Sequence, residues 1–204
     1  MPRGQITFKI DGYDDPFVVK EKFNMAIPPS TNNYAIGKGK LYIADFSTSP
    51  NWKPMGNCPS IEIEPQVERL EHFSSMSGLK NRDKYPVVQA KYTVNFDADE
   101  ICAENLTVFL QGSLSGSGLY GLQNTDKEYS LKFVSDNPIG QNSTWTFHRC
   151  VIANNGAMSL IGDDWMTMSF TAEGLADPSN TSSPYFTVEF SSTTTSSSST
   201  TASS

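Results

Sequence analysis

The sequence predicts a mainly β protein with a single α-helix, built around one unusually long pair of strands. Within residues 61–68 and 87–97, apolar and polar side chains alternate with a two-residue period. This period is typical of extended strands with one buried and one solvated face. The apolar positions are Ile61, Ile63, Val67, Val88, Ala90, Tyr92, Val94 and Phe96. The polar positions are Glu62, Glu64, Gln66, Glu68, Gln89, Lys91, Thr93 and Asn95.

We expect the two segments to pair as an antiparallel ribbon, with Ile61 opposite Phe96, Ile63 opposite Val94 and Val67 opposite Ala90. Shifts of two residues preserve the same facing, so the alternation alone leaves them open. Complete burial of the apolar face would stabilise the fold by about 10–20 kcal/mol. Pro65 has no amide hydrogen, so we expect it at a bulge or where its nitrogen has no partner in the ladder.

The segment between the two arms, Ser74 to Pro86, is predicted to be a loop because it is too long and too charged for a tight turn. It contains a basic cluster in an acidic protein, formed by Lys80, Arg82 and Lys84. Two interpretations remain open. In the first, the segment is a solvated loop. In the second, which we favour, it docks on an acidic surface of a neighbouring copy.

Further alternating segments predict strands over 4–10, 39–46, 129–134, 144–152, 165–173 and 184–190. Residues 100–111 are predicted to form the helix, with its amino end capped by nearby carboxylates and an apolar stripe facing the core. The capping residues are Asp97, Asp99, Glu100 and Glu104, and the stripe is Ile101, Leu106, Phe109 and Leu110. Residues 113–121 are predicted to be a Gly/Ser loop, and 154–156 a turn.

These elements define three regions of the 204-residue chain. Residues 1–37 are expected to form an N-terminal arm with a first strand, and residues 38–190 the β domain. Residues 191–204 contain only Ser, Thr and one Ala. Such a segment cannot bury apolar surface, so it is predicted to be disordered.

Charge and composition exclude several classes of function. The net charge of −7 and the isoelectric point near 4.8 argue against a protein that grips nucleic acid through basic patches. The first residues lack the apolar core of a signal peptide, so we expect synthesis and assembly in a cytoplasm. Cys58, Cys102 and Cys150 have no metal-like spacing and are expected to be reduced structural residues.

Several patterns of chemical interest have simpler explanations. Residues 116–121 match the letters GxGxxG, but no strand precedes them and no helix follows, as a nucleotide loop requires. The only histidines, His72 and His148, belong to no nucleophilic motif, although Cys150 lies close to His148. The acidic group near residue 100 lacks the spacing of a calcium loop. We therefore predict no enzymatic activity, no cofactor and no metal site.

Four groups of segments, in this order and spacing, resemble the tail tube (major tail) proteins of long-tailed, non-contractile bacteriophages. They cover roughly residues 36–178. The segments are Gly39–Ala44, Ile61–Ser75, Ser77–Lys80, Tyr92–Phe96 with Glu104–Leu106, Trp145–Ile152, Leu160–Trp165, Ser169–Glu173 and Leu175–Pro178.

The resemblance implies a tail-tube β-sandwich or barrel fold with one flanking helix. It also implies hexameric rings that stack into a tube for genomic DNA, with the long ribbon contributing to an oligomeric β-barrel. The expected lumen-lining residues are Glu62, Glu64, Gln66, Glu68, Gln89, Lys91, Thr93 and Asn95. The expected inter-ring residues are Ser77, Gly78, Leu79, Lys80, Arg82 and Lys84.

The resemblance also implies partners and a location. The protein is expected to assemble with itself and with tape measure, tail terminator and distal tail proteins. Double-stranded DNA is expected to pass without sequence-specific binding, and the location is the virion tail. A tube subunit of a contractile tail or of a secretion system is the nearest alternative. A glycan-binding β-sandwich with a Ser/Thr stalk is the alternative from another class, and it calls for secretion.

Overall fold

The predicted long strand pair forms as β3 (Ile61–Arg69) and β6 (Val87–Ala98). The register is the predicted one, with Ile61 opposite Phe96, Ile63 opposite Val94 and Val67 opposite Ala90. The computed structural model describes residues 31–76 and 78–191. The predicted strand over 4–10, almost all of the N-terminal arm and the Ser/Thr tail beyond residue 191 therefore lie outside the described residues.

Pro65 sits where its missing amide hydrogen costs nothing. The amide of Asp97 donates to the carbonyl of Ser60 at 3.1 Å, which makes 60/97 a hydrogen-bonded pair. Hydrogen-bonded and non-bonded pairs alternate in an antiparallel ladder, so the pair of Pro65 and Tyr92 is non-bonded. The proline nitrogen points away from β6, as one of the two expected arrangements requires. The bulge lies elsewhere, between Glu68 and Arg69.

The ribbon is one end of an eight-stranded sheet within the described residues, with the order β2-β1-β9-β10-β11-β6-β3 and β12 paired to β10. The remaining strands are β1 (Gly39–Asp45), β2 (Lys53–Pro54), β9 (Glu128–Ser135), β10 (Ser143–Asn154), β11 (Met168–Gly174) and β12 (Phe186–Phe190). A 3-10 turn, η1, spans Thr31–Asn33. The strands predicted within 39–190 are confirmed, except that β11 begins at Met168 and β12 at Phe186, both later than predicted. Because of the later start of β11, Trp165 lies outside the sheet.

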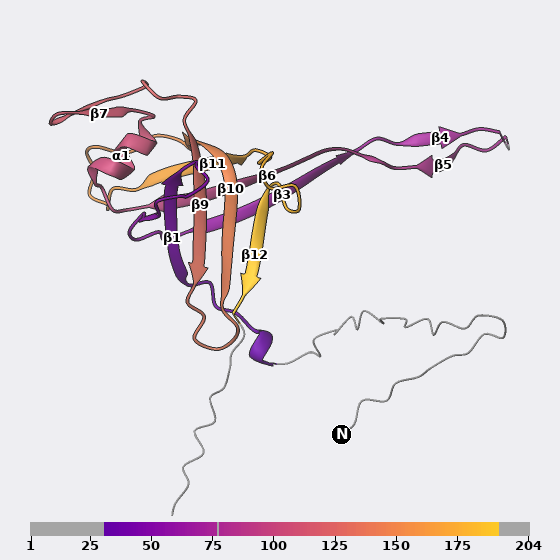
Figure 1. Cartoon of the computed structure of the whole chain (residues 1–204), viewed down its shortest axis with the longest axis horizontal. Coiled ribbons are helices and arrows are strands. Elements are labelled where there is room, and N and C mark those ends of the chain that lie inside the picture. The colour runs from indigo at the N-terminus through magenta and orange to yellow at the C-terminus, as the bar shows by residue number, and fades with distance from the viewer. Residues whose placement is uncertain (1–30, 77, 192–204) are drawn as a thin grey trace, which may run out of the picture. The chain divides into compact units, whose positions relative to one another are not determined.

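Strand β10 divides the sheet. Its residues 143–147 pair with β12 and its residues 150–154 pair with β11, both on the edge opposite β9. The register with β9 shifts between Phe147 and Cys150, at the point of division. Because a bulge increases local twist, β11, β6 and β3 run across the direction of β1, β9, β10 and β12 (Figure 1).

The two parts of the sheet enclose one apolar core. Its largest fully buried side chains are Tyr92, Phe96, Phe170, Leu41, Met55, Leu131, Ile152 and Met168. Phe96 and Phe170 lie directly opposite each other on β6 and β11, with ring centroids 4.8 Å apart and planes 11° apart. Phe109 of the helix meets Phe170 edge-on at 5.6 Å. These three rings join the helix to the ribbon.

Replacing Phe170 with Ala is expected to lower the free energy of unfolding by about 3–5 kcal/mol, because it leaves a cavity and removes both ring contacts. Chemical denaturation of the two proteins measures the difference. Thr171→Ala is the matched control, because Thr171 lies on the other face of the same strand. Equal stability of the Phe170 and Thr171 variants would contradict the assigned facing of β11.

The helix is shorter than predicted and is capped differently. Helix α1 spans Ala103–Phe109, with Cys102 as the N-cap and its sulfur accepting from the Asn105 amide at 3.5 Å. Two predicted capping carboxylates are engaged elsewhere. Asp97 accepts from Ser60 Oγ and Asp99 from Asn57 Nδ2, both at 2.6 Å. These contacts keep the chain extended beyond β6, so only Glu104 of the predicted acids lies in the first turn.

Buried Asn105 fixes the position of the helix. Its side-chain amide donates to the carbonyls of Met55 and Glu100, both at 2.9 Å. The buried apolar residues of the helix are Val108 and Phe109, whereas the predicted stripe residues Ile101 and Leu110 are each 38% exposed. The helix therefore covers the core through a narrower contact than the sequence predicts.

Two segments predicted as loops contain short hairpins. β7 (Ser113–Ser115) pairs with β8 (Gly118–Tyr120), and Gly116 adopts a φ of 61° in the connecting turn. This turn accounts for the glycine-rich letters of residues 116–121. Likewise, β4 (His72–Ser74) pairs with β5 (Asn81–Lys84), inside the segment between the two arms of the ribbon. The expectation of a loop was wrong because the ribbon's pairing resumes beyond its bulge.

Candidate assembly surface

The eight polar residues predicted to line a lumen share one face of the ribbon. Cross-strand partners lie on the same side of an antiparallel sheet. The pairs are Glu62 with Asn95, Glu64 with Thr93, Gln66 with Lys91 and Glu68 with Gln89. The opposite face of the same strands carries the buried residues Tyr92, Val94 and Phe96. The ribbon therefore separates a polar surface from the core.

Strand β11 widens this polar face, which the sequence did not reveal. Ser169, Thr171 and Glu173 lie opposite Asp97, Asn95 and Thr93 of β6. The hydroxyl of Thr171 donates to Asn95 Oδ1 at 2.8 Å, linking the two strands. Polar residues alternate through 169–173, so the sequence shows a two-faced strand. It does not show which strand lies beside it.

Negative charge dominates the face formed by β3, β6 and β11, which we call the acidic face. Its carboxylates are Glu62, Glu64, Glu68, Asp97 and Glu173, and Lys91 is a cation among them. Arg69, the last residue of β3, follows the bulge and lies over the ring of Tyr85. Glu62, Glu64, Glu68 and Glu173 are exposed. With five carboxylates and Lys91, such a surface is negative on balance and repels phosphate.

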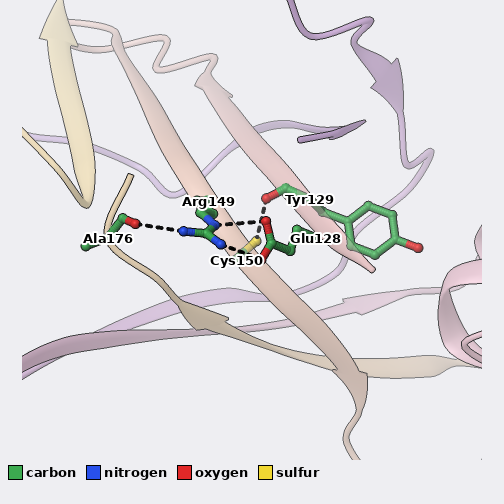
Figure 2. A network of polar contacts seen from close by, with 5 residues as sticks. All are labelled: Glu128, Tyr129, Arg149, Cys150 and Ala176. Carbon is green, nitrogen blue, oxygen red and sulfur yellow. Dashed lines mark hydrogen bonds and ion pairs between the residues drawn. The ribbon is translucent and has the colours of Figure 1, made fainter. Parts of the chain in front are cut away.

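The next strand contributes a neutral ion pair to the polar side of the sheet. Arg149 of β10 donates from Nε and Nη2 to the two carboxylate oxygens of Glu128 at 2.9 and 2.6 Å (Figure 2). Its Nη1 donates to the carbonyl of Ala176 at 3.2 Å. The Arg149 guanidinium lowers the pKa of Glu128. The ion pair therefore connects β9, β10 and the segment after β11, next to the bulge in β10. We assign it a structural role.

Cys150 and His148 do not face each other. The thiol of Cys150 is fully buried and donates to the carbonyl of Tyr129 at 3.4 Å (Figure 2), and burial raises its pKa. His148 Nε2 lies 3.2 Å from Asn180 Nδ2. The bulge after Phe147 breaks the simple alternation that would direct both side chains the same way.

Alkaline pH is expected to destabilise the fold. Burial, together with the charges of Asp99, Asp97 and Glu100, raises the pKa of Cys58 from 9.0 to about 11. A thiol with a higher pKa in the folded state adds stability below the unfolded pKa and loses it as pH rises through the folded pKa. The thermal midpoint of unfolding should therefore decrease as the pH rises from 9 to about 11.

Burial also raises the pKa of Tyr129 to about 12, so the decline continues at still higher pH. Cys58→Ala is the control, since it removes one of the two thiols whose pKa is raised and should make the lower part of the profile less steep. A wild-type midpoint that is constant over the whole range would contradict the prediction.

The ribbon leaves the core halfway along its length. Tyr92 is 2% exposed, whereas the apolar positions beyond it toward the hairpin are open to solvent. The exposed large apolar residues of this projecting part are Val67, Leu70, Phe73, Met76, Leu79, Tyr85, Val87 and Val88. The neighbouring strand β11 pairs only with residues 93–98 of β6, so the other strands of the sheet end before they reach this part.

The β4–β5 hairpin at the end of the ribbon is held by its own charged contacts (Figure 1). Arg82 pairs with Glu71 at 2.9 Å, and His72 lies 2.5 Å from Asp83. The guanidinium groups of Arg69 and Arg82 lie 5.5 and 4.6 Å from the ring centre of Tyr85. Among the described residues, no ion pair involves Lys80 or Lys84.

The predicted inter-ring residues belong to this hairpin. Arg82 and Lys84 lie on β5, and Gly78, Leu79 and Lys80 lie in the connection that precedes it, whereas Ser77 is outside the described residues.

Of the described residues, no three His, Cys, Asp or Glu gather in a metal-binding group. Helices in the described part of the chain are too short or too polar to span a membrane.

Comparison with known proteins gave two matches. A family model described as "Protein of unknown function UCP028589" matches residues 34–118, which include the ribbon, its hairpin and α1. One solved structure with a similar chain arrangement is the cryo-EM structure of the anti-feeding prophage cap (AFP tube terminating cap). It is 9% identical, with a TM-score of 0.41, and the match covers 82% of this chain and 100% of that chain. No curated protein matches the sequence.

Proposed function

We propose that this protein is a structural subunit of a phage tail tube, in which hexameric rings stack around an acidic lumen that conducts genomic DNA during ejection. The sequence resemblance and the geometry of the ribbon support this proposal. The role is mechanical and electrostatic, and it requires no catalytic residue or cofactor.

The observation that carries the proposal is the division of the ribbon into an acidic face, a core face and a projecting end. The exposed apolar residues on the two-stranded projection are not covered within the described subunit, and such exposed apolar surfaces mark interaction sites. Strand β3 also forms a free edge of the sheet within the described residues. Closure of a ring would remove that edge and cover the apolar positions.

The dimensions of the sheet agree with a tube for DNA. If each of six subunits contributes β3, β6, β11 and the second half of β10, the barrel has about 24 strands. A strand spacing of about 4.8 Å and a tilt of about 40° then give a backbone cylinder about 45–50 Å across. After side chains are added, such a bore passes a DNA duplex. The carboxylates of the acidic face line it and offer phosphates no binding partner.

In this role the protein acts within the virion tail after assembly in the host cytoplasm. Its partners are further copies of itself, together with the tape measure, tail terminator and distal tail proteins of the same particle. Identical stacked rings contain no signal for stopping, so another component sets the length of the tube.

Negative-stain electron microscopy of the purified full chain tests the proposal. We expect rings with sixfold symmetry or hollow tubes with a central channel. The concentration is raised stepwise while light scattering is followed, because open-ended assembly depends on concentration. A protein that remains monomeric throughout this range would rule out self-assembly into a tube.

A further inference from the structure

A second exposed apolar surface lies at the opposite end of the ribbon from the hairpin. It belongs to the segment between β10 and β11, where Leu160, Ile161 and Trp165 are 73%, 95% and 94% exposed. This segment returns to the sheet at Met168, which lies opposite Ala98, the last residue of β6. The hairpin, in contrast, adjoins Val87, the first residue of β6.

This surface is hollowed and acidic. A cleft of about 520 Å³ is lined by Asp99, Ile101, Leu160, Gly162, Asp164 and Trp165. Asp163 is exposed beside it, and Glu100 is exposed on the segment that follows β6. Residues 95–111 and 154–167 contain no Lys or Arg. We call this surface the acidic cleft.

The hairpin has the complementary character. Its exposed apolar residues include Phe73, Leu79 and Tyr85. Lys80 and Lys84 have no ion-pair partner in the described part of the chain, whereas the cleft carries carboxylates without nearby cations. Complementary charges across an apolar contact set its orientation and exclude wrong pairings.

The hairpin cannot reach the cleft of its own chain. The two lie at opposite ends of the twelve-residue strand β6. An extended strand of this length holds them about 35–40 Å apart. A hairpin that fills this cleft must therefore come from another copy.

We infer that the β4–β5 hairpin of one copy docks into the acidic cleft of the next copy. Leu79 and Phe73 pack against Trp165, Ile161 and Leu160, and Lys80 and Lys84 face Asp163 and Asp164. The contact joins two different surfaces, so it repeats from copy to copy without closing on itself along the stack. The inference rests on the proposed function and identifies the receiving surface for the hairpin.

Charge exchange tests the inference in the full-length chain. Lys80→Glu with Lys84→Glu places like charges in the contact and leaves the Arg82–Glu71 pair intact. This variant is expected to lower the amount of sedimentable tube by at least about tenfold. Asp163→Lys with Asp164→Lys should cause a similar loss. The variant that combines all four substitutions should recover most of the tube, because the attraction is restored with reversed sign.

A cross-link provides a measurement that does not depend on the yield of tubes. Leu79→Cys and Ile161→Cys are combined in one chain in which Cys58→Ser and Cys102→Ser remove the two native thiols that are not fully buried. Oxidation of this chain should give a ladder of covalent multimers. A mixture of the two single variants should give only dimers.

The outcomes separate the inference from the proposed function. If the wild-type chain forms tubes, but the combined charge variant is not restored and no cross-link forms, the receiving surface is wrong and the tube role stands. If the wild-type chain forms neither rings nor tubes, the proposed function and the inference both fail. Recovery together with the ladder establishes the contact.

Discussion

Virions whose tube carries Lys in place of Glu62, Glu64 and Glu68 are expected to eject their DNA at least about tenfold more slowly than wild type. The three side chains are exposed on the acidic face, opposite the core, so the subunit should fold and the rings should form. Lysine in the bore supplies cations that neutralise phosphates, and each such contact holds the duplex. Ejection triggered in vitro and followed by the fluorescence of a DNA-binding dye measures the rate.

Two controls isolate the cause. Lys at Asp126, Asp136 and Glu189 makes the same change in net charge at exposed positions outside β3, β6 and β11, and it should leave the rate unchanged. Gln at positions 62, 64 and 68 removes the acid without adding a cation and should have an intermediate effect. Raising the salt concentration should partly restore the lysine variant, since salt weakens phosphate contacts. Normal ejection by the lysine variant would show that these residues do not line the bore.

Removing the hairpin is expected to abolish the tube while the subunit remains folded. Residues 71–85 are replaced by Asn-Gly, a two-residue turn suited to antiparallel strands. The turn is closed by Leu70 and position 86, between which the amide of Leu70 already donates to the carbonyl of Pro86 at 3.0 Å. The variant also carries Pro86→Val, because proline lacks the amide that must donate back to the carbonyl of Leu70. The hairpin contributes no residue to the core. The thermal midpoint should therefore change by no more than about 4 °C.

Electron microscopy and sedimentation measure the assembly of this variant, and calorimetry measures its folding. The charge variant Lys80→Glu with Lys84→Glu serves as a second probe, because it keeps the length of the ribbon unchanged. Tubes of normal appearance from the hairpin deletion would mean that the projection does not hold copies together. A large fall in the thermal midpoint would instead mean that the hairpin supports the subunit itself.

The sequence by itself determined the ribbon, which side chains share each of its faces, and the composition of its polar face. Side chains on a strand alternate with a period of two, so facing can be read from a short segment without knowledge of the rest of the chain. This local rule restricts the register to alternatives that differ by two residues. The structure has the predicted one, which pairs Ile61 with Phe96 and Ile63 with Val94. The missing amide hydrogen of Pro65 likewise restricted its place in the ladder.

Only the tertiary structure decided which strand lies beside the ribbon, where the helix begins and how far the core extends. The residues of β11 pair with residues of β6 that lie 70 to 80 positions earlier in the chain, and a local period contains no information about such a partner. The capping acids were misassigned because Asp97 and Asp99 have hydrogen-bond donors in a distant segment, Ser60 and Asn57. Val67 and Tyr92 share one apolar face, yet Val67 is 54% exposed and Tyr92 is 2% exposed. Burial depends on what covers a side chain, and over the projecting half of the ribbon no part of the described subunit does so.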